Sequence, residues 1–315
     1  MDFHHLPVLL NECLDGLDIK PTGVYLDCTL GGAGHSSEIL KRLNAGGTLV
    51  GIDRDADAIE AATARIEALR APGRFVPLRG NFHDAPALLE EAKIDRSLDG
   101  ILIDLGVSSH QLDVRERGFS YHDDAPLDMR MDRSQPLSAR DIVNGASEDE
   151  LNRILRDYGE EKWARQIARV ICDRRKQTPV ETTSQLVDIV DAAIPKKLRQ
   201  GDGSHPARRT FQALRIAVND ELDPLEPALR ALVGLLKPGG RLCVITFHSL
   251  EDRIVKNTFR SLADPCTCPK SFPVCVCGKK PVVKPITRKP ITASPEELAQ
   301  NPRSRSASLR IVEKL

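Results

Sequence analysis

The chain has 315 residues and a mass of 34.7 kDa, with 45 basic and 45 acidic side chains and a formal net charge of +0. Hydrophobic residues make up 41% and charged residues 29%, which excludes wholesale disorder and favours one or two globular domains. The chain has no apolar run of the ~20 residues that span a membrane and no signal peptide, so we expect a cytoplasmic protein. The balanced charge argues at first against nucleic acid as a partner.

The first third of the chain alternates β-rich runs with segments of helical periodicity. Strands are expected at 23–29, 48–53, 74–78 and 98–105. Helices are expected between them at 36–43, with Ser36 or Ser37 as the cap, and at 57–69 and 84–92. Repeated βα units of this length predict a parallel sheet.

The middle of the chain changes character. From about 114 to 206 no segment predicts a strand, and helices are expected at 138–144, 148–158, 161–174 and 183–194. A helical region at 209–236, broken near Asp223 and Pro224, leads to a turn at 237–240 and a buried strand at 241–247. The tail from 264 to 302 is rich in proline and lysine and is expected to be mostly loop, before a last edge strand at 308–312.

Because the α/β pattern resumes after the helices, we predict an α/β fold with an inserted helical domain. The predicted sheet domain is discontinuous and comprises residues 1–113 and 207–315. The predicted insertion, 114–206, is expected to bind the substrate.

Residues 30–35 form a glycine cluster between the first strand and the first helix of the sheet. Gly31, Gly32, Ala33 and Gly34 let the backbone approach a ligand closely, and the helix that follows directs its free N–H groups at it. The residues that cradle a diphosphate, G-x-G-x-x-G or G-K-[ST], are absent.

Two acidic residues accompany this cluster. Asp53 ends the next strand, where a carboxylate accepts hydrogen bonds from ribose hydroxyls. Asp104 ends another strand on the same edge of the sheet. The combination favours a nucleoside cofactor without a diphosphate, and S-adenosylmethionine is the leading candidate.

The cysteines fall into two groups. Cys13, Cys28, Cys172 and Cys243 are scattered through apolar or mixed segments, as small hydrophobic residues are. The others form two C-x-C pairs, Cys266 with Cys268 and Cys275 with Cys277. Two interpretations are open: a tetrahedral structural zinc site, or reduced loop cysteines, because the spacing is not the usual C-x₂-C.

Basic residues gather in two segments despite the balanced total. One group is Lys196, Lys197, Arg199, Arg208, Arg209 and Arg215, and the other is Lys270, Lys279, Lys280, Lys284, Arg288 and Lys289. Each group is interpreted either as a set of phosphate contacts or as a solvated face.

Several long motifs run along the chain from end to end. They are HLPVLL (5–10), DCTLGGAGHS (27–36), GIDRD (51–55), IDLGVSS (103–109) with QLD (111–113), ERGFS (116–120), PLDMRMD (126–132), HPA (205–207), TFQA (210–213) and FHSLEDR (247–253). Together they resemble the MraW/RsmH methyltransferases, which transfer a methyl group from S-adenosylmethionine to the exocyclic N4 amine of a cytosine in bacterial 16S ribosomal RNA.

The resemblance implies a class I, Rossmann-like methyltransferase fold and 16S rRNA as the partner, within the 30S subunit or a late assembly particle, with neither membrane nor DNA involved. It implies cofactor contacts at Ala33, Gly34, His35, Asp53, Phe82, Asp104 and Gln111. The alternatives are the same fold acting on another amine, in DNA or protein, and an RNA-binding assembly factor that keeps the cofactor site as a relic.

Catalytic roles stay open at this stage. Asp104 is interpreted either as a cofactor contact or as the acceptor for the target amine. His248 either faces the site or belongs to a capped helix start, in which Ser249 precedes Glu251 and Asp252. Phe119, Tyr121, Phe247 and His248 are candidates for a platform under the target base, and a substrate-closing loop at 128–132 is a hypothesis.

Overall fold

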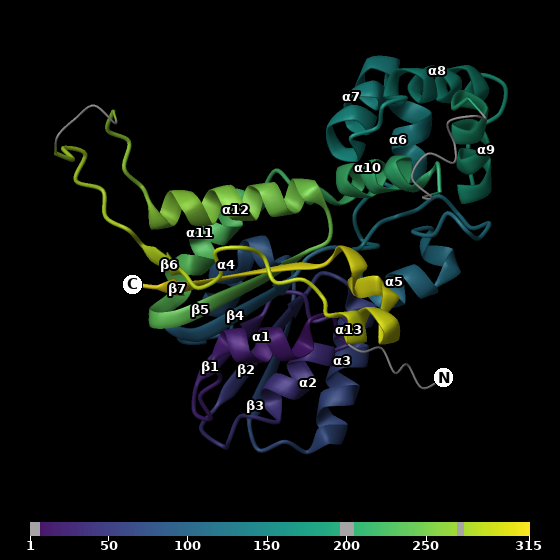
Figure 1. The fold of residues 1–315 in the computed structure, drawn as a ribbon. Coiled ribbons are helices and arrows are strands. Elements are labelled where there is room, and N and C mark those ends of the chain that lie inside the picture. The colour runs from purple at the N-terminus through teal and green to yellow at the C-terminus, as the bar shows by residue number, and fades with distance from the viewer. Residues whose placement is uncertain (1–6, 196–204, 270–273) are drawn as a thin grey trace. The chain divides into compact units, whose positions relative to one another are not determined.

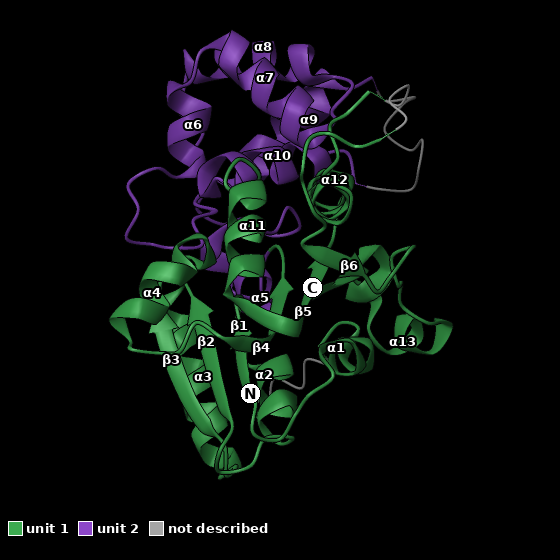
Figure 2. Cartoon of the chain, turned by 90° about the vertical axis from the view of Figure 1, so that its left-hand side faces the viewer, with its two compact units in different colours: residues 1–106, 222–315 green, residues 107–221 purple. Residues whose placement is uncertain are grey.

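The computed structural model describes residues 7–195, 205–269 and 274–315 (Figure 1). The chain divides into a sheet unit, residues 1–106 and 222–315, and a helical unit, residues 107–221 (Figure 2). The helical unit therefore extends beyond the segment 114–206 at both ends. Its C-terminal extension is helix α10 (Arg208–Asn219), which packs against α7 (Glu148–Gly159).

The sheet unit is built on a seven-stranded sheet in the order β3-β2-β1-β4-β5-β7-β6. The strands are β1 (Val24–Asp27), β2 (Thr48–Asp53), β3 (Arg74–Arg79), β4 (Leu98–Asp104), β5 (Leu236–Thr246), β6 (Val283–Pro285) and β7 (Ser308–Lys314). Strands β1 to β5 pair in parallel, and β7 is antiparallel to both β5 and β6. The predicted α/β class with a parallel sheet is confirmed.

Helices cover both faces of this sheet (Figure 1). One face carries α1 (Leu10–Leu17), α2 (Gly34–Leu40) and α3 (Ala56–Leu69), with Leu14, Ile39 and Ile66 in a shared apolar cluster. The other face carries α4 (Ala85–Glu91), α11 (Leu225–Leu235) and α12 (Ser249–Ala263), which share a second cluster. Because both faces are covered, consecutive residues of a strand are apolar, as Ile101, Leu102 and Ile103 of β4 are.

The C-terminal strands differ from the prediction. Strand β7 is not an edge strand but lies between β5 and β6. Leu309, Ile311 and Val312 are all buried, since side chains on both faces of the strand are covered. The edge is the short β6, which lies in the tail expected to be loop and ends in Pro285, a residue suited to an edge strand. The predicted turn at 237–240 falls within β5, where the pairing register jumps from Leu236 to Arg241.

The helical unit has its own apolar core. Its helices are α5 (Ser109–Asp113), α6 (Ala139–Gly145), α7, α8 (Ala164–Arg175), α9 (Thr183–Ala193) and α10. Among its described residues the β-pairing is limited to one isolated bridge, Pro126 with Thr182. Short helices at α1, α5 and α13 (Pro295–Gln300) were not predicted. Within the described ranges, no helix is long and apolar enough to cross a membrane.

Candidate functional site

The glycine cluster folds back onto the end of β2. Gly31 (φ 47°) and Ala33 (φ 55°) adopt the left-handed conformation, which glycine tolerates best. The Gly31 N–H donates a hydrogen bond to Asp53 Oδ2 at 2.8 Å. The structure thus brings together two of the elements predicted to bind the cofactor.

The predicted cap of α2 is wrong. The helix begins at Gly34 with Ala33 as its N-cap residue, so Ser36 and Ser37 lie inside it. Ser36 Oγ donates to Asp27 Oδ2 at 2.7 Å, and Ser37 Oγ donates to the Ala33 carbonyl at 2.6 Å. Both hydroxyls therefore hold the loop and the end of β1 in place.

Asp53 stands at the carboxyl end of β2 and is half-buried. Its Oδ2 accepts from Gly31, and its Oδ1 accepts from the Asp55 N–H at 2.9 Å. Burial raises the pKa of Asp53 to about 6, against the opposing effect of these hydrogen bonds. At neutral pH the group is mostly a carboxylate, and each oxygen retains a lone pair for a ligand hydroxyl.

Asp104 stands at the carboxyl end of β4, which pairs with β1. Its N–H donates to Thr29 Oγ1 at 2.7 Å, whereas its buried Oδ1 has no hydrogen-bond partner among the described residues. Burial, reinforced by the charges of Asp27 and Glu251, raises the pKa of Asp104 to about 8. Without a ligand the group is therefore largely protonated at neutral pH, and Oδ1 is an acceptor that a ligand donor could satisfy.

The sequence assigned no role to Asp27 or Thr29. Thr29 holds the backbone of Asp104, and the buried carboxyl of Asp27 contributes to the raised pKa of Asp104. Their position at the end of β1, the strand beside β4, is the signal that points to them.

His35 is buried in α2 beside this edge. Its Nε2 lies 2.9 Å from the Val8 carbonyl, which only accepts, so Nε2 carries the proton and donates. Burial lowers the pKa of His35 to about 4, and the ring is neutral at pH 7. Its Nδ1, 3.9 Å from Asp104 Oδ2, therefore faces that carboxyl as a neutral group and does not form an ion pair. In this structure His35 ties the N-terminal segment to the glycine cluster.

Phe82 follows β3 and is buried in the apolar cluster under α4 and α11. Asn81 caps the short turn that carries it, accepting from the His83 N–H at 3.2 Å. The ring of His83 meets that of Phe82 edge-on, with centroids 4.3 Å apart. Phe82 is thus a core residue, and its contact with a cofactor stays a prediction.

Gln111 belongs to the helical unit and is buried in α5. It forms a capping box with Ser108: the Ser108 N–H donates to Gln111 Oε1 at 3.1 Å, and the Gln111 N–H donates to Ser108 Oγ at 3.2 Å. The structure gives Gln111 this role in the helix start, and its cofactor contact also stays a prediction.

His248 is the N-cap residue of α12. Its ring accepts from the Glu251 N–H at 3.4 Å, and Glu251 Oε2 accepts from the Phe247 N–H at 2.8 Å. Of the two interpretations of this motif, the capped helix start is therefore present in the structure, with His248 rather than Ser249 as the cap.

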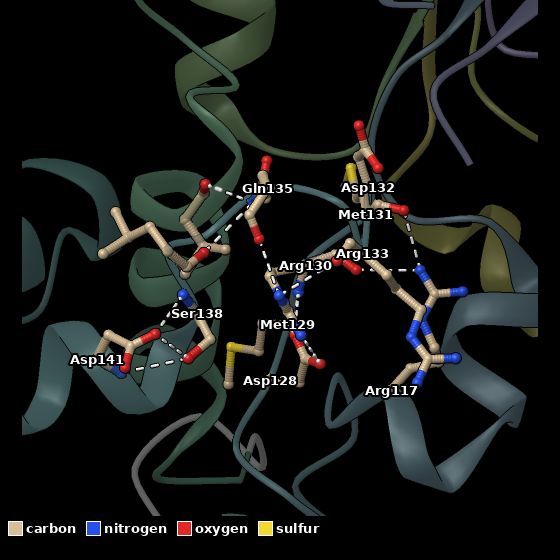
Figure 3. Close-up of polar contacts among 12 residues, drawn as sticks. Arg117, Asp128, Met129, Arg130, Met131, Asp132, Arg133, Gln135, Ser138 and Asp141 are labelled. Atoms are coloured by element: carbon tan, nitrogen blue, oxygen red, sulfur yellow. Dashed lines mark hydrogen bonds and ion pairs between the residues drawn. The ribbon is translucent and has the colours of Figure 1, made fainter. Parts of the chain in front are cut away.

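The PLDMRMD motif is a loop held by its own side chains (Figure 3). The Arg130 guanidinium pairs with both oxygens of Asp128, at 2.7 and 3.0 Å. Met129 and Met131 are buried in the core of the helical unit. Between them Asn219 closes the loop, accepting from the Met131 N–H and donating to the Met129 carbonyl, each at 2.8 Å. These contacts give the motif a structural function and do not support a loop that closes over substrate.

The ERGFS motif packs against the same loop. Arg117 is buried and donates to the carbonyls of Arg130 and Met131, each at 3.0 Å. Gly118 has φ 69°, and a Cβ there would lie 2.2 Å from the Pro126 carbonyl oxygen, so glycine is required. Phe119 is buried in the helical core, which makes it unsuited as an exposed platform for a base.

Tyr121 lies in an aromatic cluster of the helical unit. Its ring stacks on His205 at 4.7 Å between centroids and meets Phe211 edge-on at 5.6 Å. The exposed His122 lies beside it at 4.5 Å. Of the four candidate platform residues, Tyr121 is thus the one that belongs to a partly exposed aromatic group within the helical unit.

The two basic segments differ in the structure. Arg215 of the first pairs with Glu221, both distances being 2.9 Å, and Arg209 donates to the Glu160 carbonyl. Lys196, Lys197 and Arg199 lie outside the described residues, as does Lys270 of the second group. The other members of the second group, Lys279, Lys280, Lys284, Arg288 and Lys289, are all exposed. The tail segment is therefore the stronger candidate for phosphate contacts.

The clustered cysteines lie in the loop between α12 and β6. The Sγ atoms of Cys266, Cys268, Cys275 and Cys277 all lie within 4.8 Å of one another. The scattered cysteines are buried singly, as their sequence context predicted.

Similarity to known proteins extends over the whole chain. The profile of the MraW methylase family matches residues 2–315. A protein named ribosomal RNA small subunit methyltransferase H from Symbiobacterium thermophilum is 55% identical over 315 residues, covering 100% of this chain and 98% of the relative. The protein of the same name from Clostridioides difficile is 53% identical and is covered completely. Among solved structures, an rRNA methylase from Streptococcus thermophilus aligns with 99% of both chains at 9% identity and a TM-score of 0.41.

Proposed function

The chain belongs to the MraW methylase family, and from this premise we propose that it methylates the exocyclic N4 amine of a cytosine in bacterial 16S rRNA, with S-adenosylmethionine as the methyl donor. It is a methyltransferase with the class I, Rossmann-like fold. The observation that carries the proposal is the match of the full chain to relatives named ribosomal RNA small subunit methyltransferase H.

The residues at the carboxyl ends of β1, β2 and β4 fit S-adenosylmethionine. The glycine cluster, Gly31 to Gly34, leaves backbone open to a ligand beside Asp53, whose oxygens each retain an acceptor site for a ribose hydroxyl. Asp104 contributes a buried oxygen, Oδ1, that has no hydrogen-bond partner within the described part of the chain. When bound, the cofactor supplies an electrophilic methyl group on a sulfonium centre.

We assign Asp104 to the cofactor rather than to the target amine. Its pKa of about 8 means that binding of a cationic ligand nearby would favour the ionised form, which accepts hydrogen bonds. A base that takes a proton from the amine would also suit a pKa near the working pH. The two roles separate in kinetics: loss of a cofactor contact raises the KM for S-adenosylmethionine, while loss of an acceptor in the reaction lowers kcat.

The target amine is a weak nucleophile, because its lone pair is delocalised into the cytosine ring. The chain must therefore align the amine with the methyl carbon and exclude water. The target base must also be unstacked to reach the methyl group. We assign this task to the helical unit, residues 107–221, as the substrate-binding domain, with Tyr121 and His122 as aromatic contacts for RNA.

The exposed tail lysines and arginine are proposed to bind rRNA phosphates. Lys279, Lys280 and Lys284 lie in a stretch with no acidic residue between Asp264 and Glu296. Each phosphate contact lowers log K by about 0.7 to 0.9 for every tenfold rise in salt, so replacing one of these lysines with glutamine should reduce that slope by about this amount.

The substrate is proposed to be the 30S subunit or a late assembly particle, encountered in the cytoplasm. The test offers labelled S-adenosylmethionine with naked 16S rRNA, 30S subunits, DNA and a protein extract. We expect label in the RNA of 30S subunits. Label in DNA or protein would favour the alternative of another amine substrate, and the absence of transfer despite cofactor binding would favour an assembly factor.

A further inference from the structure

The loop between α12 and β6 holds four sulfur atoms at short distances. Cys266 and Cys268 lie in the first arm of the loop, which follows α12. Cys275 and Cys277 lie in the second arm, which leads to β6. The Sγ atom of Cys275 lies 3.5 Å from that of Cys266, 3.9 Å from that of Cys268 and 3.4 Å from that of Cys277. The Sγ atoms of Cys266 and Cys277 are 3.9 Å apart.

These distances match a tetrahedral metal site. A zinc ion with four thiolates at about 2.3 Å places neighbouring sulfurs about 3.8 Å apart, the edge of the tetrahedron. A disulfide instead needs about 2.05 Å between sulfurs, and none of the eight cysteines forms one. We propose that Cys266, Cys268, Cys275 and Cys277 form a structural tetrathiolate zinc site.

The surrounding backbone supports thiolate ligands. The Val276 N–H donates to Cys268 Sγ at 3.3 Å, and the N–H groups of Thr267 and Lys279 are directed at the sulfur of Cys277. Such donors are the second layer of contacts that orients metal ligands and stabilises their charge. Each C-x-C pair therefore supplies two sulfurs from one arm, and the departure from C-x₂-C spacing is no obstacle to a common centre.

The described parts of the loop have little apolar packing of their own. The side chains of Val274 and Val276 are 69% and 72% exposed, and the described parts of the loop, 264–269 and 274–282, contain neither helix nor strand. Its base is closed by the Val282 N–H, which donates to the Leu262 carbonyl at 2.8 Å. Beyond that bond, a metal cross-link supplies the folding energy that an apolar core does not.

The distribution of cysteine in the chain supports the same conclusion. The four scattered cysteines are each at most 7% exposed, whereas Cys266 and Cys275 are exposed. Four thiolates with zinc carry a net charge of −2, and the neighbouring Lys279 and Lys280 offset it. Soft thiolate ligands favour zinc over the hard cations Mg²⁺ and Ca²⁺. The site would fix the part of the basic tail segment that Lys279 and Lys280 occupy.

The first test measures metal in the full-length protein, purified without a metal-affinity tag or chelator. Mass spectrometry of the elements should find about one zinc per chain, released when the thiols are modified with a mercurial. Cys275→Ser and Cys266→Ser should lose the zinc. The controls Val276→Ser, in the same loop, and Cys172→Ser, a buried thiol elsewhere, should retain it.

The second test does not depend on the variants. Chelation of zinc from the wild-type protein should increase the rate of tryptic cleavage after Lys279 about tenfold or more, because the freed loop opens. Adding zinc back should restore protection. A reduced protein that holds no zinc after purification and reconstitution would overturn the proposal, as would iron in its place. Loss of zinc in Val276→Ser equal to that in Cys275→Ser would also overturn it.

Discussion

Replacing Asp53 with asparagine separates the cofactor contact of this residue from its structural contacts. Asparagine keeps one carbonyl oxygen, which still accepts a hydrogen bond from the Asp55 N–H. Its amide nitrogen takes the place of Oδ2, which in the wild-type protein accepts from the Gly31 N–H at 2.8 Å. Because an amide N–H₂ only donates, the hydrogen bond from Gly31 is lost. The lost charged hydrogen bond costs about 1.5–3 kcal/mol of folding free energy. The variant also removes a buried charge, and the rise in the pKa of Asp53 from 3.8 to about 6 corresponds to about 3 kcal/mol at neutral pH.

These two effects oppose each other, so the free energy of unfolding of Asp53→Asn should stay within about 2 kcal/mol of wild type. Cofactor binding has no such compensation. Loss of one charged acceptor and weakening of the other should remove about 2–4 kcal/mol, which is about a 30- to 1,000-fold rise in Kd.

The assay is calorimetric titration with S-adenosylmethionine, beside urea unfolding of the free protein. Asp55→Asn is the matched control, because asparagine caps α3 as well as aspartate does and Asp55 accepts from the Asp57 N–H. Its Kd should change by less than about twofold. An unchanged Kd for Asp53→Asn, or an equal loss in Asp55→Asn, would refute the assignment of Asp53 to the ribose.

Three further predictions concern Asp104, Gly118 and His248. The raised pKa of Asp104, about 8, means that the folded state without ligand binds a proton more tightly than the unfolded state, so wild-type stability falls as pH rises from about 4 to 8. Asp104→Asn should therefore gain stability relative to wild type between pH 5 and pH 9 in urea unfolding, and parallel pH profiles would refute the shift. Gly118→Ala should destabilise the protein by about 2–4 kcal/mol because its Cβ meets the Pro126 carbonyl, whereas Gly145→Ala, with open space around its Cβ, should be neutral or stabilising in thermal unfolding. His248→Asn should keep the cap of α12 and retain methyl transfer, while His248→Ala should lose about 1 kcal/mol; loss of activity in a stable His248→Asn protein would instead indicate a catalytic role.

The sheet could be predicted from the sequence because its central strands contain short runs of consecutive apolar residues. Helices cover both faces of strands β2 (Thr48–Asp53) and β4 (Leu98–Asp104). A strand that is buried on both faces is rich in apolar residues, and this can be seen in the sequence. The position of β7 could not be predicted, because strand order depends on pairing between segments far apart in the chain. Leu309 and Ile311 pair with Ile245 and Cys243, which precede them by more than sixty residues.

In the candidate site, too, features set by the local sequence could be predicted, and features set by contacts between distant segments could not. Asp53 and Asp104 were found because each ends a strand, a position that sequence periodicity defines. The function of Met129 and Met131 was not found, since the residue that closes their loop, Asn219, lies 88 positions beyond Met131. The cysteines were judged by spacing along the chain, whereas the short distances between their sulfurs arise across the two arms of a loop.

The identity of the methylated nucleoside tests the central claim most directly. The protein is incubated with labelled S-adenosylmethionine and 30S subunits, and the RNA is digested to nucleosides and separated by liquid chromatography with mass spectrometry. The account predicts label in N4-methylcytidine from 16S rRNA. Label in 5-methylcytidine, in another nucleoside or in ribosomal protein alone would contradict it.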